Sequence, residues 1–283
     1  MKSSKLKKLV AAVGLATFGM VAAGNASAVV VGNIDFGAIG ATSHLDTTTV
    51  AETLVNAAGQ TLFGYGQVNT VNGDSTYCAT DANCRLFFSF TYNTQAFTGA
   101  TAAFNAGVIN IYYDPGTGGA ATGNTRNLLN FSSPANLAYI NGLSLWTQLT
   151  GHNFASVFCG TTQLCATATS LSGVNSGFTG SGLADVNLAA AGLPAVENYF
   201  NGNSEADGLG GFADITLSTS GGTSVLNRFD TCTNQPGQWC IQGSADIRGR
   251  TVVVPEPASL GLLGVGLLGL VAGLRRRKAK VVA

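Results

Sequence analysis

The C-terminal end of the chain holds the feature that most restricts its fold. Residues 258–274 contain no charged side chain and consist of Leu, Gly, Val, Ala and one Ser. As a helix rising about 1.5 Å per residue, this run would extend roughly 25 Å, close to the thickness of the apolar part of a bilayer. Five basic residues follow, at positions 275–278 and 280. Because basic residues beside an apolar segment resist translocation, we expect a transmembrane helix whose end stays in the cytoplasm.

A short motif stands immediately before this run, formed by Pro255, Glu256 and Pro257. The two prolines keep it out of a helix and hold it extended, as a protease groove requires. The order of tripeptide, apolar helix and basic tail resembles the PEP-CTERM sorting signal, here over residues 253–280. In that family exosortase, an integral-membrane transpeptidase-like protease, recognises Pro-Glu-Pro and processes the protein during export. The resemblance implies a transient inner-membrane anchor and then a place at the cell surface or in the extracellular matrix. A permanent anchor is the alternative.

The N-terminal end also predicts export. Four lysines within the first eight residues precede an apolar run at 9–23, and small residues follow at Ala26 and Ala28. This pattern predicts a secretory signal peptide over residues 1–28, a helix that signal peptidase removes after Ala28. The Sec translocon and signal peptidase are therefore expected partners. Residues 29–252 remain as the exported domain, which is long enough for one domain with its own core.

Charge is distributed unevenly between these segments and the domain. Residues 29–254 contain five arginines, no lysine and thirteen acidic residues, which gives a net charge of −8. An acidic domain is not expected to bind nucleic acid or anionic lipid, but it can bind divalent cations.

Six cysteines form three local pairs, each around a polar loop: Cys78 with Cys84, Cys159 with Cys165, and Cys232 with Cys240. An even number, local spacing and an export signal favour disulfide bonds. A zinc site would need Cys-x2-Cys spacing or histidine partners, and the sequence has neither. Disulfides that close such short loops stabilise by only about 2 kcal/mol each, so we expect them to fix loops.

The exported domain is predicted to be all-β. Runs rich in β-forming residues are separated by turn signals, and they lie at 61–68, 85–92, 108–113, 144–149 and 212–217. Helical periodicity is weak and confined to 46–58 and 194–200. These patterns favour one β-sandwich or jelly-roll-like domain, flanked by the signal-peptide helix and the C-terminal transmembrane helix. We expect Trp146 in its core and Trp239, in a cysteine-bracketed loop, at the surface.

The sequence contains no recognisable catalytic motif. Its two histidines, His44 and His152, stand apart and without a motif, and carboxylates such as Glu52 and Glu197 offer only an unspecific pair for glycoside hydrolysis. We therefore expect no enzyme activity and no required cofactor.

One loop has oxygen donors spaced as in a calcium-binding loop: Asn203, Glu205, Asp207 and Asp214, with Gly208 at the turn. The pattern departs from the calcium loop at its first and last positions, and no helices flank it. A solvated polar turn is the alternative interpretation.

The PEP-CTERM resemblance implies an association with biofilms or flocs. The segments 32–36 and 107–114 also resemble, broadly, flocculation-associated members. We therefore expect a non-enzymatic surface or matrix protein that associates with exopolysaccharide or cells. The alternatives are a secreted, lectin-like carbohydrate-binding module and a glycan hydrolase.

Overall fold

The computed structural model describes residues 28–38, 43–81, 83–116, 126–168 and 177–249. The chain divides into two compact units, 1–251 and 252–283, and every described residue belongs to the first. The strands are β1 Ala28–Val31, β2 Ile34–Ala38, β3 Ser43–Thr53, β4 Thr61–Gln67, β5 Thr70–Val71, β6 Arg85–Phe97, β7 Thr101–Asp114, β8 Ser144–His152, β9 Phe154–Ser156, β10 Gly160–Thr162, β11 Leu164–Ala168, β12 Gly177–Val186, β13 Glu205–Ala206, β14 Phe212–Ala213, β15 Ile215–Thr223 and β16 Trp239–Gly249. The helices are the 3-10 turn η1 Leu128–Asn130, α2 Ser133–Asn141 and α3 Pro194–Phe200.

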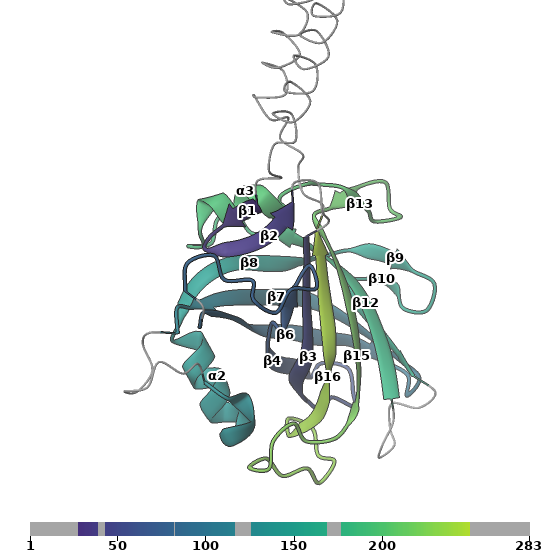
Figure 1. Ribbon diagram of the computed structural model, residues 1–283. Helices are drawn as coiled ribbons and strands as arrows, with labels where there is room; N and C mark the ends of the chain where they lie inside the picture. The colour runs from purple at the N-terminus through teal and green to yellow at the C-terminus, as the bar shows by residue number, and fades with distance from the viewer. Residues whose placement is uncertain (1–27, 39–42, 82, 117–125, 169–176, 250–283) are drawn as a thin grey trace, which may run out of the picture. The chain divides into compact units, whose positions relative to one another are not determined.

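One antiparallel sheet closes on itself as a barrel-like ring of eight positions. Neighbouring strands follow the order β12-β15-β16-β3-β4-β6-β7, and the eighth position between β7 and β12 is shared by two strands. β11 bridges β7 and β12 over one half of their length, and β8 bridges them over the other half. Figure 1 shows the long strands β3, β16, β15 and β12 on the side opposite β6, β7 and β8. Closure pairs the backbone groups that an open sheet would leave at its two edges.

Aromatic rings lie flat against the inside wall because glycines stand beneath them. A Cβ added at Gly64 on β4 would lie 2.1 Å from Cζ of Phe90 on β6, and one added at Gly107 would lie 2.1 Å from Cε1 of Tyr92. Gly66 is covered in the same way by Phe88. The rings therefore pack onto the backbone of the neighbouring strands and leave the centre of the barrel less filled.

One end of the barrel is closed by a cap made of the β1–β2 hairpin and α3, which lie together in Figure 1. The hairpin turns at Gly32 and Asn33, whose φ values of 55° and 68° belong to a type I′ turn. Below it, Phe36 packs on Tyr199 and Phe200 with ring centroids 4.7 and 5.7 Å apart. Trp146 is fully buried and donates from Nε1 to the Gly32 carbonyl at 3.0 Å. The cap is thus an extension of the hydrophobic core.

Helix α2 covers part of the outer surface of the sheet. Its Ile140 packs with Ala51, Tyr65 and Phe87, which point away from the barrel interior. The Tyr65 hydroxyl lies 2.8 Å from Ser133 Oγ at the start of the helix. This small second core buries one outer region of the sheet.

The structure corrects two predictions of the fold. The strands form a single closed sheet instead of a β-sandwich or jelly roll, since β7 and β12 are joined through β8 and β11. Residues 46–58 do not form a helix but belong largely to β3, where the β-branched run at 47–50 favours the extended conformation. The other proposed helix, at 194–200, is α3. Trp146 lies in the core as predicted, whereas Trp239 is half-buried against Tyr65, with ring centroids 5.3 Å apart.

The predicted signal-peptide helix and the C-terminal helix at 258–274 lie outside the described residues, as do Ala26 and the Pro255-Glu256-Pro257 motif. Ala28 is the first residue of β1. Within the described ranges, no helix has the length and apolar character needed to cross a membrane.

The ring-on-glycine packing predicts a position-specific cost for adding a side chain. Gly64→Val should lower the free energy of unfolding by about 2 kcal/mol, because the new side chain displaces the Phe90 ring. Gly177→Val is the matched control on β12, where an added Cβ would meet only the Gly221 carbonyl oxygen at 3.8 Å. Urea unfolding measures both, and equal costs for the two variants would contradict this packing.

Candidate functional site

The inside of the barrel contains an apolar cavity of about 110 Å³. Six aromatic residues contribute to its lining: Phe88, Phe90, Tyr92, Phe97, Phe104 and Phe178. Aliphatic side chains such as Leu62, Ile109 and Leu217 complete the wall. An eight-stranded barrel is wide enough for its interior to be filled by side chains or to hold one small ligand.

The cavity lies in the half of the barrel away from the cap. Its lining includes Phe97 and Thr223, the last residues of β6 and β15, and Ile241 near the start of β16. The cap contacts the opposite strand ends, where Cδ1 of Phe200 lies 3.0 Å from the position of a Cβ on Gly249. Phe97, Phe178 and Ile241 are half-buried, so the strand ends on this side are where the cavity approaches solvent.

A single glutamate carboxyl stands among these apolar side chains. Glu52 on β3 pairs with Gly64, which pairs in turn with Phe90 on β6. Residues paired directly across antiparallel strands share one face, so the Glu52 side chain points into the barrel with the Phe90 ring. Only 6% of its surface is exposed. Among the described residues, none forms a hydrogen bond or ion pair with this carboxyl.

Burial raises the pKa of Glu52 from 4.5 to about 7, because the apolar surroundings disfavour the charged form. The carboxyl is therefore largely protonated below neutral pH and can donate a hydrogen bond. Glu52 is therefore a candidate functional group, since carboxyls with a strongly shifted pKa in cavities are often functional.

A second polar residue contributes to the lining. Tyr92 is 2% exposed, and its buried hydroxyl has no hydrogen-bond partner among the described residues. Burial raises the pKa of this hydroxyl, which therefore stays protonated at any physiological pH. The wall of the cavity thus contains two buried polar groups without a partner among the described residues, the Glu52 carboxyl and the Tyr92 hydroxyl.

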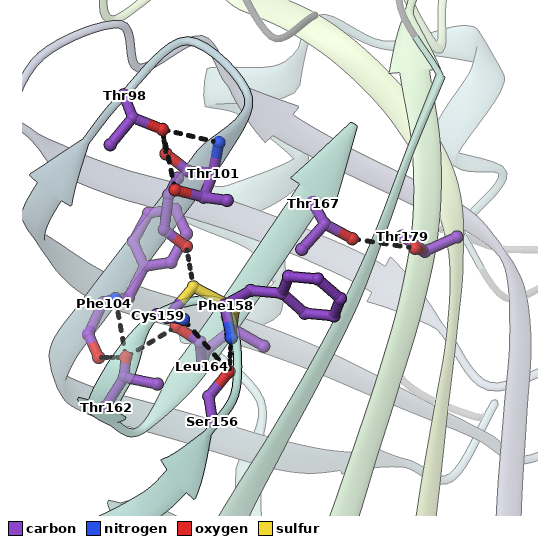
Figure 2. The surroundings of a disulfide bond; sticks show 12 residues. Thr98, Thr101, Phe104, Ser156, Phe158, Cys159, Thr162, Leu164, Thr167 and Thr179 are labelled. Carbon is purple, nitrogen blue, oxygen red and sulfur yellow. Dashed lines mark hydrogen bonds between the residues drawn. A yellow bond between two sulfur atoms is a disulfide. The ribbon is translucent and has the colours of Figure 1, made fainter. Parts of the chain in front are cut away.

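The three cysteine pairs form disulfide bonds in the combinations that their spacing favours. Cys159–Cys165 joins the β9–β10 hairpin to β11, as Figure 2 shows. The Ser156 hydroxyl accepts hydrogen bonds from the amides of Phe158 and Cys159, at 3.3 and 3.2 Å. Next to this disulfide, Leu164 begins β11 and lines the cavity. The disulfide therefore fixes a loop beside the cavity wall.

The side chains of the predicted calcium loop form hydrogen bonds within the protein, and those of Asp207 and Asp214 accept from backbone amides. Asp207 Oδ1 accepts from the amides of Leu209 and Gly211 at 2.7 and 2.9 Å, within the β13–β14 hairpin. Asp214 accepts from the amides of Asn203 and Val186. Glu205 contacts the neighbouring Ser204 hydroxyl. These contacts build a polar turn, and the calcium hypothesis gains no support from them.

His152 on β8 links the β13–β14 turn to the barrel through two aspartates. Its Nδ1 lies 2.7 Å from Asp185 Oδ2 on β12, and its Nε2 lies 3.2 Å from Asp207 Oδ2. Burial alone would lower the pKa of His152, but the hydrogen bonds and charges of the two aspartates outweigh it and raise the pKa. This contact is one that sequence spacing gave no reason to expect.

The other histidine belongs to an ionic cluster on the outer surface. Within the described ranges, His44, Asp46 and Asp246 form the one group of three acidic or metal-binding side chains whose ligand atoms lie within 4.8 Å of one another. Arg248 donates from Nε to Asp246 Oδ2 at 2.6 Å and lies 3.3 Å from His44 Nε2. The guanidinium already supplies positive charge there, so we interpret the cluster as an ion-pair network between β3 and β16.

Sequence reasoning named Glu52 only as one of several carboxylates. The signal for its position was the alternation of Val50, Glu52 and Leu54, which places the glutamate on the apolar face of a strand. The helix predicted for 46–58 hid this alternation.

The buried carboxyl predicts a pH-dependent stability difference for Glu52→Gln. The pKa of Glu52 is higher in the folded state than in the unfolded state. The contribution of its protonated carboxyl to the free energy of unfolding is therefore fully present below pH 4.5, and it is lost as the pH rises through about 7. The variant should exceed the wild type in free energy of unfolding by on the order of 3 kcal/mol at pH 8.5, and by little at pH 4.5. Urea unfolding of the secreted protein at both pH values measures this. Glu205→Gln, on β13, is the control and should show no such difference; a pH-independent effect of Glu52→Gln would contradict the burial.

Comparison with known proteins identifies one segment of the chain. Residues 253–278 match the family described as the PEP-CTERM protein-sorting motif. Comparisons with curated proteins and with solved structures returned no match. The matched segment contains Pro255, Glu256 and Pro257 and nearly coincides with the signal predicted over 253–280. The chain therefore carries the sorting motif of PEP-CTERM domain-containing proteins, which indicates an exported protein that exosortase processes.

Proposed function

We propose that this protein is a non-enzymatic component of the cell surface or extracellular matrix that contributes to exopolysaccharide-associated biofilm or floc formation. The sorting motif at 253–278 is the observation that carries the proposal, because it directs the domain out of the cell through exosortase. The three disulfide bonds suit an oxidising location outside the cytoplasm.

The outer surface of the sheet supports association with a hydrated polysaccharide. Hydroxyl side chains follow one another across β11, β12, β15 and β16. The Thr167 and Thr179 hydroxyls lie 3.4 Å apart (Figure 2), and those of Ser220 and Ser244 lie 2.9 Å apart. A shallow polar groove over β3, β12, β15 and β16 is lined by further hydroxyls, including Thr48 and Ser218. Such a surface can exchange its bonds with water for bonds with sugar hydroxyls at little cost.

Deletion of the gene tests this proposal in the producing cells. We expect loss of cell aggregation while secreted polysaccharide is still made, because the protein would link cells to a matrix that it does not synthesise. Complementation with the wild-type gene should restore flocs. Complementation with alanine at Pro255, Glu256 and Pro257 should not, and that product should remain unprocessed in the membrane fraction.

Two results would contradict the proposal. Unchanged aggregation after deletion would remove the matrix role, and full complementation by the motif variant would show that sorting through this motif is not needed for it.

A further inference from the structure

We propose that the barrel cavity is a binding site for a small, uncharged, apolar molecule that carries one hydrogen-bond-accepting oxygen, such as a ketone carbonyl, and that Glu52 is the residue that recognises this oxygen. This inference does not depend on a role in the matrix.

The cavity arises from a repeated packing arrangement. Phe88, Phe90 and Tyr92 lie over Gly66, Gly64 and Gly107, and on the other side of the barrel Phe178 lies over Gly221, with Cζ 2.8 Å from an added Cβ. Protein interiors are normally close-packed, with large side chains filling the centre. In this barrel four aromatic rings lie along the wall, and their faces line the space that remains in the centre. Small inward residues such as Ala102, Ala166 and Ala245 keep it open.

Glu52 gives this space its chemical selectivity. A carboxyl buried among apolar side chains without a partner costs stability and is expected to have a compensating use. Its neighbours at the same level of the barrel are Ile241, Gly64 and Phe90, and none of the described residues gives it a cation or a hydrogen bond. The Tyr92 hydroxyl is likewise unpartnered. The protonated Glu52 carboxyl can donate, and a ligand oxygen that enters the cavity can accept from it.

The apolar lining favours an uncharged ligand. An amine would pair with ionised Glu52, but both charges would then have to leave water for a cavity whose lining is mainly apolar. A carboxylate ligand would place a second acid beside Glu52. An uncharged ketone loses few hydrogen bonds on entry and recovers one from the protonated carboxyl.

A matched series of eight-carbon probes tests the proposal on the protein purified in its secreted form. Calorimetry would compare octan-2-one, octylamine and octanoate at pH 5.5 and 8.5. Octan-2-one should bind best, and its affinity should fall at least about tenfold at the higher pH, because ionised Glu52 cannot donate. Octanoate should bind at least about tenfold more weakly than the ketone.

Three variants test whether Glu52, and no other group, causes the pH dependence of ketone binding. Other titratable groups that line the cavity are Tyr92, which keeps its proton over this range, and Asp246, which pairs with His44 and Arg248. Glu52→Gln keeps the shape and should bind octan-2-one with an affinity that no longer depends on pH. Glu205→Gln should behave as wild type. Ala166→Leu, which fills the cavity without touching a charge, should weaken ketone binding at both pH values.

Several outcomes would overturn the inference. Absence of ketone binding at pH 5.5 would remove the site. The same pH dependence in wild type and Glu52→Gln would remove Glu52 from recognition. Tighter binding of octylamine than of octan-2-one would make the cavity a cation site.

Discussion

The hydrogen bonds that join β7 to β12 through β8 and β11 are the constraint on which the domain depends. Without them, the strands from β12 round to β7 would form an open, strongly curved sheet with two unpaired edges. With them, every inward side chain faces a shared interior that the cap seals at one end. The burial of Glu52, the lining of the cavity and the position of the Cys159–Cys165 disulfide all follow from this closure.

Glycine has an architectural role inside this ring. In most cores, a glycine on an inward position weakens a strand, because it contributes no side chain to packing. In this barrel the inward glycines receive aromatic rings from neighbouring strands, so apolar area is still buried against the wall. The consequence is an apolar, incompletely filled centre, and the unpartnered carboxyl of Glu52 lies on its surface. Structure and proposed binding thus have the same physical origin.

The sequence allowed local features to be predicted and left long-range ones open. The five predicted strand runs coincide with β4, β6, β7, β8 and the β14–β15 region, because alternation and β-branched residues act locally. The disulfide pairs could also be predicted from local sequence, because the two cysteines of each pair are close in the chain. Closure of the sheet could not be predicted. The alternation of apolar residues along a strand is the same whether its inward face packs on a second sheet or on the far wall of its own sheet. Glu52 was not placed in the interior, because residues 46–58 were predicted as a weak helix although Ser43–Thr53 form β3. The ring-on-glycine pairs also join strands whose register the sequence does not show.

The apolar interior of the barrel buries the Glu52 carboxyl, and the titration of Glu52 tests this burial most directly. Carbon-13 NMR of the glutamate side-chain carboxyls in the secreted protein would follow each group with pH, with Glu52→Gln used to assign the resonance. We expect a midpoint near 7 for Glu52. A midpoint near 4.5, the value of a solvated glutamate, would show that water reaches the carboxyl freely and would contradict its burial among apolar side chains.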